Sequence, residues 1–188
     1  MNIIVKPYGC NLCYCRPDTT WERENRDFYS PDCVNEVHWT PIVFARVSKA
    51  GKCVGAKFAS RYYDGVGCGM LMYCRIQDEQ DFSSCVDHTS ILPMPLYNPV
   101  VLEDDKEFVI VKGDAGDDND VFPNSQNSWK QLLEEAICSA SQLTSLRIGD
   151  FIAVELSPKA LLTSSKGSEL QIKGLFCENE SFNFKIIF

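Results

Sequence analysis

The chain has 188 residues, of which 45% are hydrophobic and 23% are charged, a composition typical of a single globular domain. This composition disfavours a disordered or coiled-coil protein, and no apolar run is long enough to cross a membrane. The formal net charge is −8 and the cations form no continuous stripe, so neither a nucleic acid nor a membrane is expected as a partner.

Ten cysteines are an unusual number for a chain of this length. The apolar stretch at the N-terminus is too short for a secretory leader, so we expect a cytoplasmic protein whose thiols are reduced and mostly buried. Zinc is an alternative, because Cys10, Cys13 and Cys15 are followed by Cys33 and His38. Only the first three are closely spaced, however, and structural zinc sites use two such groups. The spacing favours a cysteine-rich loop.

The N-terminal region is predicted to form one strand and one short helix. Asn2–Lys6 is apolar and bounded by a proline, as is typical of a strand. After Pro17, Thr19 and Glu22 have the spacing of a helix capping box. This pattern predicts a second helix that continues to about Phe28.

Most of the remaining chain is expected to be β-strand. Short segments rich in β-branched and aromatic residues, bounded by Gly, Pro, Asp or Ser, are typical of strands. The segment 100–110 is predicted to form a tight hairpin with an acidic tip. The predicted strands are Ile42–Ser48, Met70–Ile76, Val100–Glu103, Glu107–Lys112, Phe151–Leu156, Glu169–Lys173 and Phe182–Phe188.

Alternating glycines precede one of these strands and are a candidate ligand-binding loop. Gly65, Gly67 and Gly69 do not have the dinucleotide-binding spacing, and no helix start follows them. Cys68, which lies among them, could act as a nucleophile only beside a general base, and the chain has just two histidines. We expect the glycines to relieve steric contacts where a loop enters a strand.

An acidic stretch follows Lys112. Asp114, Asp117, Asp118 and Asp120 could surround calcium, but the glycine and closing glutamate of a helix–loop–helix calcium site are absent. The stretch is therefore expected to be a solvated loop.

One segment has the pattern of an amphipathic helix. Apolar side chains recur every three or four residues from Trp129 to Leu143, and Ser128 and Gln131 form a capping box before them. We predict one main helix, at about 128–142. Many strands with one main helix indicate an α+β protein that is mostly β.

The second half of the chain resembles the catalytic domain of the fumarylacetoacetate hydrolase family. That domain orders a strand, a polar loop, a helix, a Gly-Asp turn that enters a strand, and a closing pair of strands. Here Leu132–Ser141 matches the helix and Gly149-Asp150 matches the turn. The resemblance implies a fumarylacetoacetate-hydrolase-like mixed β-sheet roll at 41–188, after an N-terminal Cys-rich segment at 1–40. It also implies a homodimer.

The resemblance also implies metal chemistry, from which this chain departs. The family binds magnesium or manganese through carboxylates that include a Glu-x-Glu pair, and Cys68 and Met70 stand at those positions. Neither side chain suits a hard cation. Leu156 stands where the family has a threonine that contacts the bound acid. Mg²⁺ or Mn²⁺ is therefore expected only if the site has been rebuilt, and no cofactor is the favoured expectation.

Two functions remain open. The favoured one is a non-catalytic protein, or one with a remodelled site, that binds an unknown small ligand such as an acidic metabolite, or a partner. The alternative is a divalent-metal-dependent hydrolase, decarboxylase or tautomerase that acts on a small oxo-acid. Its site would be lined by Arg61, Tyr63, Asp64 and Glu155. A soft-metal site at Cys68, or at the N-terminal cysteines, ranks third.

Overall fold

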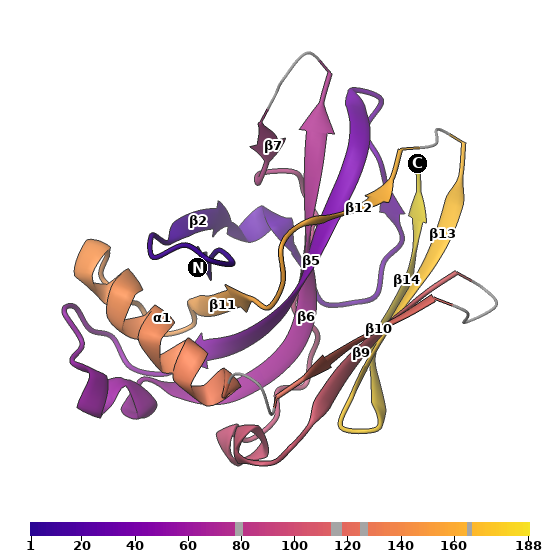
Figure 1. Cartoon of the computed structure of the whole chain (residues 1–188). Helices are drawn as coiled ribbons and strands as arrows, with labels where there is room; N and C mark the ends of the chain where they lie inside the picture. The colour runs from indigo at the N-terminus through magenta and orange to yellow at the C-terminus, as the bar shows by residue number, and fades with distance from the viewer. Residues whose placement is uncertain (78–80, 114–117, 125–127, 165–166) are drawn as a thin grey trace.

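Two β-sheets and one α-helix make up the described part of the computed structural model, which covers the chain except residues 78–80, 114–117, 125–127 and 165–166 (Figure 1). The first sheet has nine strands in the order β2-β1-β11-β5-β6-β8-β3, with β12 beside β5 and β7 beside β6. Its strands are β1 (Asn2–Lys6), β2 (Tyr14–Pro17), β3 (Trp21–Glu22), β5 (Val34–Val47), β6 (Tyr63–Ile76), β7 (Phe82–Ser83), β8 (Ser90–Ile91), β11 (Phe151–Glu155) and β12 (Ala160–Thr163).

The second sheet has five strands in the order β10-β9-β13-β14-β4. Most neighbours are antiparallel, but β1 runs parallel to β11, β3 to β8, and β4 to β14. The predicted class, a mostly β protein with mixed sheets and one main helix, is confirmed. The strands of the second sheet are β4 (Phe28–Tyr29), β9 (Glu107–Lys112), β10 (Asp118–Pro123), β13 (Glu169–Phe176) and β14 (Asn179–Ile187).

The predicted main helix is α1 (Trp129–Leu143), which packs against the first sheet beside β11. The Ser128 hydroxyl accepts the N–H of Gln131 at 3.5 Å, so the predicted cap is present. The Gln131 side chain donates to Glu135 instead of returning to Ser128, so the box is half formed. No helix in the described part of the chain is both long and apolar enough to cross a membrane.

The helix predicted after Pro17 is wrong beyond its first turn. Only a short 3-10 helix, η1 (Asp18–Thr20), forms there, and the Thr20 hydroxyl donates to the Pro17 carbonyl at 2.8 Å. The chain then extends into β3, where Trp21 pairs with Ser90. Pairing with a distant strand therefore outweighs the local capping signal.

The predicted hairpin at 100–110 is wrong in its first half. Val100–Glu103 belongs to a 3-10 helix, η3 (Pro99–Glu103), and the Asn98 side chain accepts the N–H of Val100 at 3.0 Å. Pro99 has no N–H to donate to a sheet, and its fixed φ suits the first position of a helix. Local capping here outweighs the β-branched composition of the segment.

The two faces of the first sheet support two apolar clusters. One cluster lies between the sheets and α1, and it includes Val43 and Phe108. The other lies on the opposite face of the first sheet, and it includes Phe44 and Phe151. The buried Arg16 of β2 closes this second face by donating to the carbonyl of Met72 and, at 2.6 Å, to Thr89. The first sheet therefore curls around its own small core.

The N-terminal segment is built into both sheets. β1 pairs with β11 of the first sheet, and β4 pairs with β14 of the second. The expected boundary between residues 40 and 41 falls inside β5. The first forty residues therefore share hydrogen bonds and core with the rest of the chain.

The ten cysteines are all free thiols, and the expectation that most are buried is wrong. Cys68 and Cys74 are buried, and three others are half-buried. The remaining five, which include Cys10, Cys15 and Cys33, are exposed. They lie in turns or in short edge elements, where the sheet presents no buried face.

Candidate functional site

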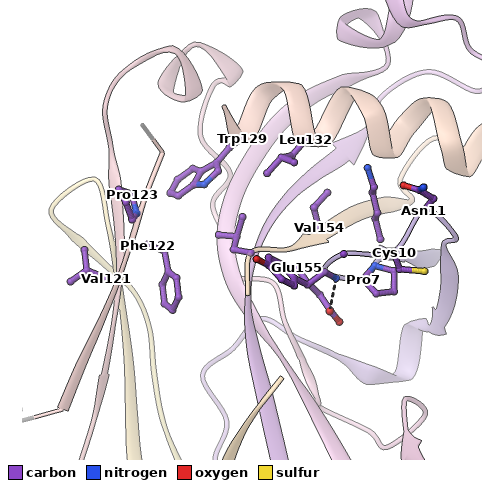
Figure 2. Close-up of a pocket in the computed structure, with 14 residues that line it drawn as sticks. Pro7, Cys10, Asn11, Val121, Phe122, Pro123, Trp129, Leu132, Val154 and Glu155 are labelled. Carbon is purple, nitrogen blue, oxygen red and sulfur yellow. Dashed lines mark hydrogen bonds between the residues drawn. The ribbon is translucent and has the colours of Figure 1, made fainter. Parts of the chain in front are cut away.

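A pocket of about 470 Å³ lies at the carboxyl end of β11, between α1, β10 and the loop that follows β1 (Figure 2). Its walls combine apolar and polar surface in similar amounts. On the apolar side, α1 contributes Trp129 and Leu132, β10 contributes Phe122, and the end of β11 contributes Val154 and Leu156. A cavity of this size can hold a small organic molecule.

Two charged side chains of opposite sign face this pocket. Lys6 comes from the end of β1, and Glu155 comes from the end of β11. The ammonium of Lys6 lies 3.5 Å from the carboxylate of Glu135, whose side chain is half exposed. This ion pair is long and its carboxylate is half exposed, so Lys6 can exchange Glu135 for a ligand carboxylate at small cost.

Glu155 is held by the protein at both carboxylate oxygens. Its Oε2 accepts the backbone N–H of Tyr8 at 2.9 Å, the bond drawn as a dashed line in Figure 2. Its Oε1 accepts the hydroxyl of Tyr73. Glu155 is 4% exposed. This carboxylate therefore fastens the loop after β1 to the first sheet.

A chain of hydroxyls continues from Glu155 into the interior of the curled sheet. The hydroxyl oxygens of Tyr73 and Tyr14 lie 2.5 Å apart, and the Arg16 guanidinium lies 5.0 Å from the centre of the Tyr73 ring. Burial raises the pKa of Tyr73 far above its usual value, and the charges of Tyr14 and Glu155 add to this effect. Tyr73 therefore stays protonated and donates to Glu155.

We expect these buried tyrosines to make the protein less stable in alkali. An unfolded tyrosine ionises near pH 10, whereas the folded Tyr73 keeps its proton, so the unfolded chain binds fewer protons above pH 10. Burial likewise raises the pKa of Tyr63 to about 12. Both contributions to stability are complete below pH 10 and are lost as the pH rises through the folded pKa.

We expect Tyr73→Phe to be less stable than wild type at pH 8, because the bond to Glu155 is lost. Between pH 10 and pH 12, however, its free energy of unfolding should fall less steeply with pH. Urea unfolding at several pH values with a reductant present measures both slopes. Equal slopes would show that Tyr73 ionises normally in the folded chain.

The four site residues named from the sequence lie in different surroundings. Arg61 is exposed at the end of η2 (Ala56–Arg61), and exposed Asp64 is ion-paired with Arg46 at 2.9 Å. Tyr63 is buried, and its hydroxyl donates to Glu134 at 3.4 Å. The described lining of the pocket includes Glu155 and none of the other three.

Cys68 and Met70 are buried in the apolar cluster between the two sheets. Neither is among the described residues that line the pocket at β11. Burial raises the pKa of the Cys68 thiol well above its usual value, which keeps it protonated and a poor nucleophile. The pair therefore serves packing in the positions where the resemblance places carboxylates.

Among the described residues, no three His, Cys, Asp or Glu side chains lie close enough together to hold a metal ion. The predicted acidic loop is partly wrong, because Asp118 and Asp120 lie in β10, and Asp120 is ion-paired with Lys112 at 2.9 Å. Asp114 and Asp117 lie outside the described residues.

Several residues of this pocket carry no functional signal in the sequence. Trp129 and Leu132 follow the helical period, which indicated only that they face the core. Lys6 and Tyr8 flank a proline just after the first strand, and no motif marks them. Their common location depends on the parallel pairing of β1 with β11, which local sequence does not encode.

Comparison with known proteins supports the fold alone. The chain matches no family model, and no curated protein sequence is significantly similar to it. Among crystal structures it is similar to fumarylpyruvate hydrolase from Pseudomonas aeruginosa in complex with Mn²⁺ and pyruvate, with a TM-score of 0.78 at 13% identity over 100% of this chain and 90% of that one.

Two other crystal structures are similar to this chain in fold. Maleylpyruvate hydrolase from Sphingobium sp. SYK-6, in complex with manganese and pyruvate, matches with a TM-score of 0.72 at 15% identity over 99% of this chain and 70% of that one. A protein from Yersinia pestis CO92 assigned to the fumarylacetoacetate hydrolase family matches with a TM-score of 0.71 at 12% identity. The match covers 99% of this chain and 92% of that one.

Proposed function

We infer, from the fumarylacetoacetate-hydrolase fold that this chain has, that the pocket at the end of β11 is a remodelled site that binds a small organic acid without a divalent metal. The observation that carries this inference is the state of Glu155. It is the one carboxylate among the described lining residues, and the protein already occupies both of its oxygens.

The donor set does not fit a hard divalent cation. Mg²⁺ and Mn²⁺ prefer about six oxygen ligands, which in proteins include one or two carboxylates that are free to coordinate the ion. Glu155 offers one carboxylate, whose oxygens accept hydrogen bonds from Tyr8 and Tyr73. Cys68 and Met70, which stand where the resemblance places the Glu-x-Glu pair, lie in the core. We therefore assign no metal-dependent step to this chain.

The pocket does fit a molecule with an apolar body and one anionic end. Trp129, Leu132 and Val154 provide apolar surface for the body. Lys6 provides a positive charge whose side chain is 14% exposed, so that little water competes for it. A ligand carboxylate that pairs with Lys6 would replace the long contact with Glu135.

The alternative function is a metal-dependent hydrolase or tautomerase that acts on a small oxo-acid. It is supported by the titles of the similar structures, which name fumarylpyruvate and maleylpyruvate hydrolases in complex with manganese and pyruvate. Such an enzyme would need carboxylates beyond Glu155 in the pocket. The homodimer that the resemblance implies also stays a prediction.

Thermal unfolding separates the two functions. We expect phenylpyruvate to raise the melting temperature more than pyruvate or oxalate does, with no further rise when Mn²⁺ is added. A ligand at about 100 times its dissociation constant adds about 2.7 kcal/mol, which is easily measured in a domain of this size. Electron paramagnetic resonance of Mn²⁺ should show only the free aqueous ion.

The matched control compares two lysines. Lys6→Met should abolish the shift caused by phenylpyruvate, whereas Lys130→Met should retain it, because Lys130 pairs with Glu103 and does not line the pocket. A shift that requires Mn²⁺ together with pyruvate or oxalate would instead establish the metal-dependent alternative. If no acid changes the melting temperature, the proposal for this pocket is contradicted.

A further inference from the structure

The segment between β5 and β6 carries an isolated group of positive charges. From Arg46 to Tyr63 the sequence contains five cations and no carboxylate. The turn at 146–149 lies beside this segment, because Gly51 and Leu146 exchange backbone hydrogen bonds at 3.1 and 2.8 Å. The group formed by the exposed cations, here called the basic patch, consists of Lys49, Lys52, Lys57, Arg61 and Arg147.

None of these five side chains has a carboxylate partner among the described residues. Most other cations of the chain do, as Lys106, Lys173 and Lys185 illustrate. Asp64, the first carboxylate after the segment, is already ion-paired with Arg46. The basic patch is therefore an uncompensated positive surface on a chain of net charge −8.

The surface around the basic patch is rigidly supported. The N–H of Cys53 donates to the carbonyl of Ser141 at 2.8 Å, which fixes the segment to the end of α1. The ammonium of Lys49 lies 5.3 Å from the centre of the Tyr62 ring, and Tyr62 packs directly on Gly51. In Figure 1 this purple segment lies beside α1. A surface held in this way presents its charges in a fixed arrangement.

Large apolar side chains are exposed among these cations. Ile148 is 73% exposed, Leu143 is 61% exposed and Phe58 is 40% exposed. Phe58 lies between two members of the basic patch, with Lys57 4.8 Å and Arg61 5.4 Å from the centre of its ring. Exposed apolar groups inside a charged surface are typical of protein–protein interfaces.

We propose that the basic patch docks an acidic segment of a partner protein that also carries large apolar side chains. Its carboxylates would pair with the five cations, and its apolar side chains would cover Phe58, Leu143 and Ile148. This proposal is independent of the pocket at β11. It follows from charge complementarity and from the exposed apolar groups together.

A short acidic segment suits this surface better than an extended polyanion does. Without the five cations, the rest of the chain has a net charge of −13, since the whole chain has −8. A nucleic acid or an anionic membrane extends beyond the patch and meets this negative remainder, which repels it. A short segment contacts the patch alone. Aliphatic side chains such as Ile148 also offer nothing to a phosphate backbone.

Fluorescence anisotropy tests the proposal with the full chain. The probe is a fluorescein-labelled peptide of repeated Glu-Glu-Phe, compared with an all-Glu peptide of the same length. We expect the Glu-Glu-Phe peptide to bind more tightly, and binding to weaken as salt is raised. The triple variant Lys52→Ser, Lys57→Ser and Arg61→Ser should lose about tenfold or more in affinity. Phe58→Ser with Ile148→Ser should also weaken binding of the Glu-Glu-Phe peptide.

A matched control has the same loss of charge elsewhere. The triple variant Lys106→Ser, Lys173→Ser and Lys185→Ser removes three ion-paired cations at the surface, and it should change the affinity less than twofold. Equal losses in both triple variants, no binding at low salt, or indifference to Phe58 and Ile148 would each overturn the proposal. Tighter binding of oligo(dT) or of phosphatidylglycerol vesicles would also overturn it, in favour of a polyanion or a membrane.

Discussion

Gly69→Ala is expected to destabilise the protein by about 3 kcal/mol or more, because its methyl group has no space. Gly69 lies in β6 beside the chain at Ile91, and a Cβ at this position would be driven into the Ile91 carbonyl oxygen. The obstacle is backbone, so it cannot move as a side chain can. Relief would require β6 and β8 to separate.

Gly55→Ala is the matched control. Gly55 has a φ of −78°, which alanine adopts readily, and the nearest atom to its added Cβ is a carbon of Phe58 at 3.9 Å. Here the substitution should stabilise the protein by about 0.5 kcal/mol, because it restricts the unfolded chain. Urea unfolding measures both variants. A cost below about 1 kcal/mol for Gly69→Ala would contradict the close approach of the two strands.

Glu155→Ala is expected to cost about 3 kcal/mol, since it leaves the buried Tyr73 hydroxyl and the half-buried bond of the Tyr8 N–H without their charged acceptor. The Tyr8 N–H and the Tyr73 hydroxyl both lose their bond to the carboxylate. The loop that follows β1 would no longer be fastened to β11. Hydrogen exchange at the Tyr8 amide should accelerate in parallel with the loss in the free energy of unfolding.

Glu155→Gln separates the charge from the shape of the side chain. Its amide oxygen can still accept one of the two hydrogen bonds, so we expect about half of the cost of Glu155→Ala. In a double-mutant cycle, Tyr73→Phe and Glu155→Gln should be strongly non-additive, because they act on one bond. Additive effects, or unchanged exchange at Tyr8, would show that Glu155 does not hold this loop.

Where local signals agree with tertiary contacts, the sequence predicts the elements well. β1 and β9 have the predicted bounds, and α1 begins after Ser128 as expected. β5 and β6 begin well before Ile42 and Met70, because each is extended by pairing with the other along most of its length. A long partner strand can stabilise residues whose own β preference is weak.

The two wrong predictions have different causes. The helix predicted after Pro17 gave way to pairing between β3 and β8, which are far apart in the chain. The strand predicted at Val100–Glu103 gave way to the cap that Asn98 provides. The first was decided by a long-range pairing and the second by a competing local cap, because residue propensities are weak and either kind of contact can outweigh them.

The sequence by itself determined the class of fold and the main helix, because these depend on residue type and short-range period. Only the tertiary structure decided which side chains meet. It placed Glu155 against Tyr8 and Tyr73, and it brought Arg147 beside the cations of the segment before β6. Such contacts require strand pairings between residues about a hundred or more positions apart, and no local pattern encodes those pairings.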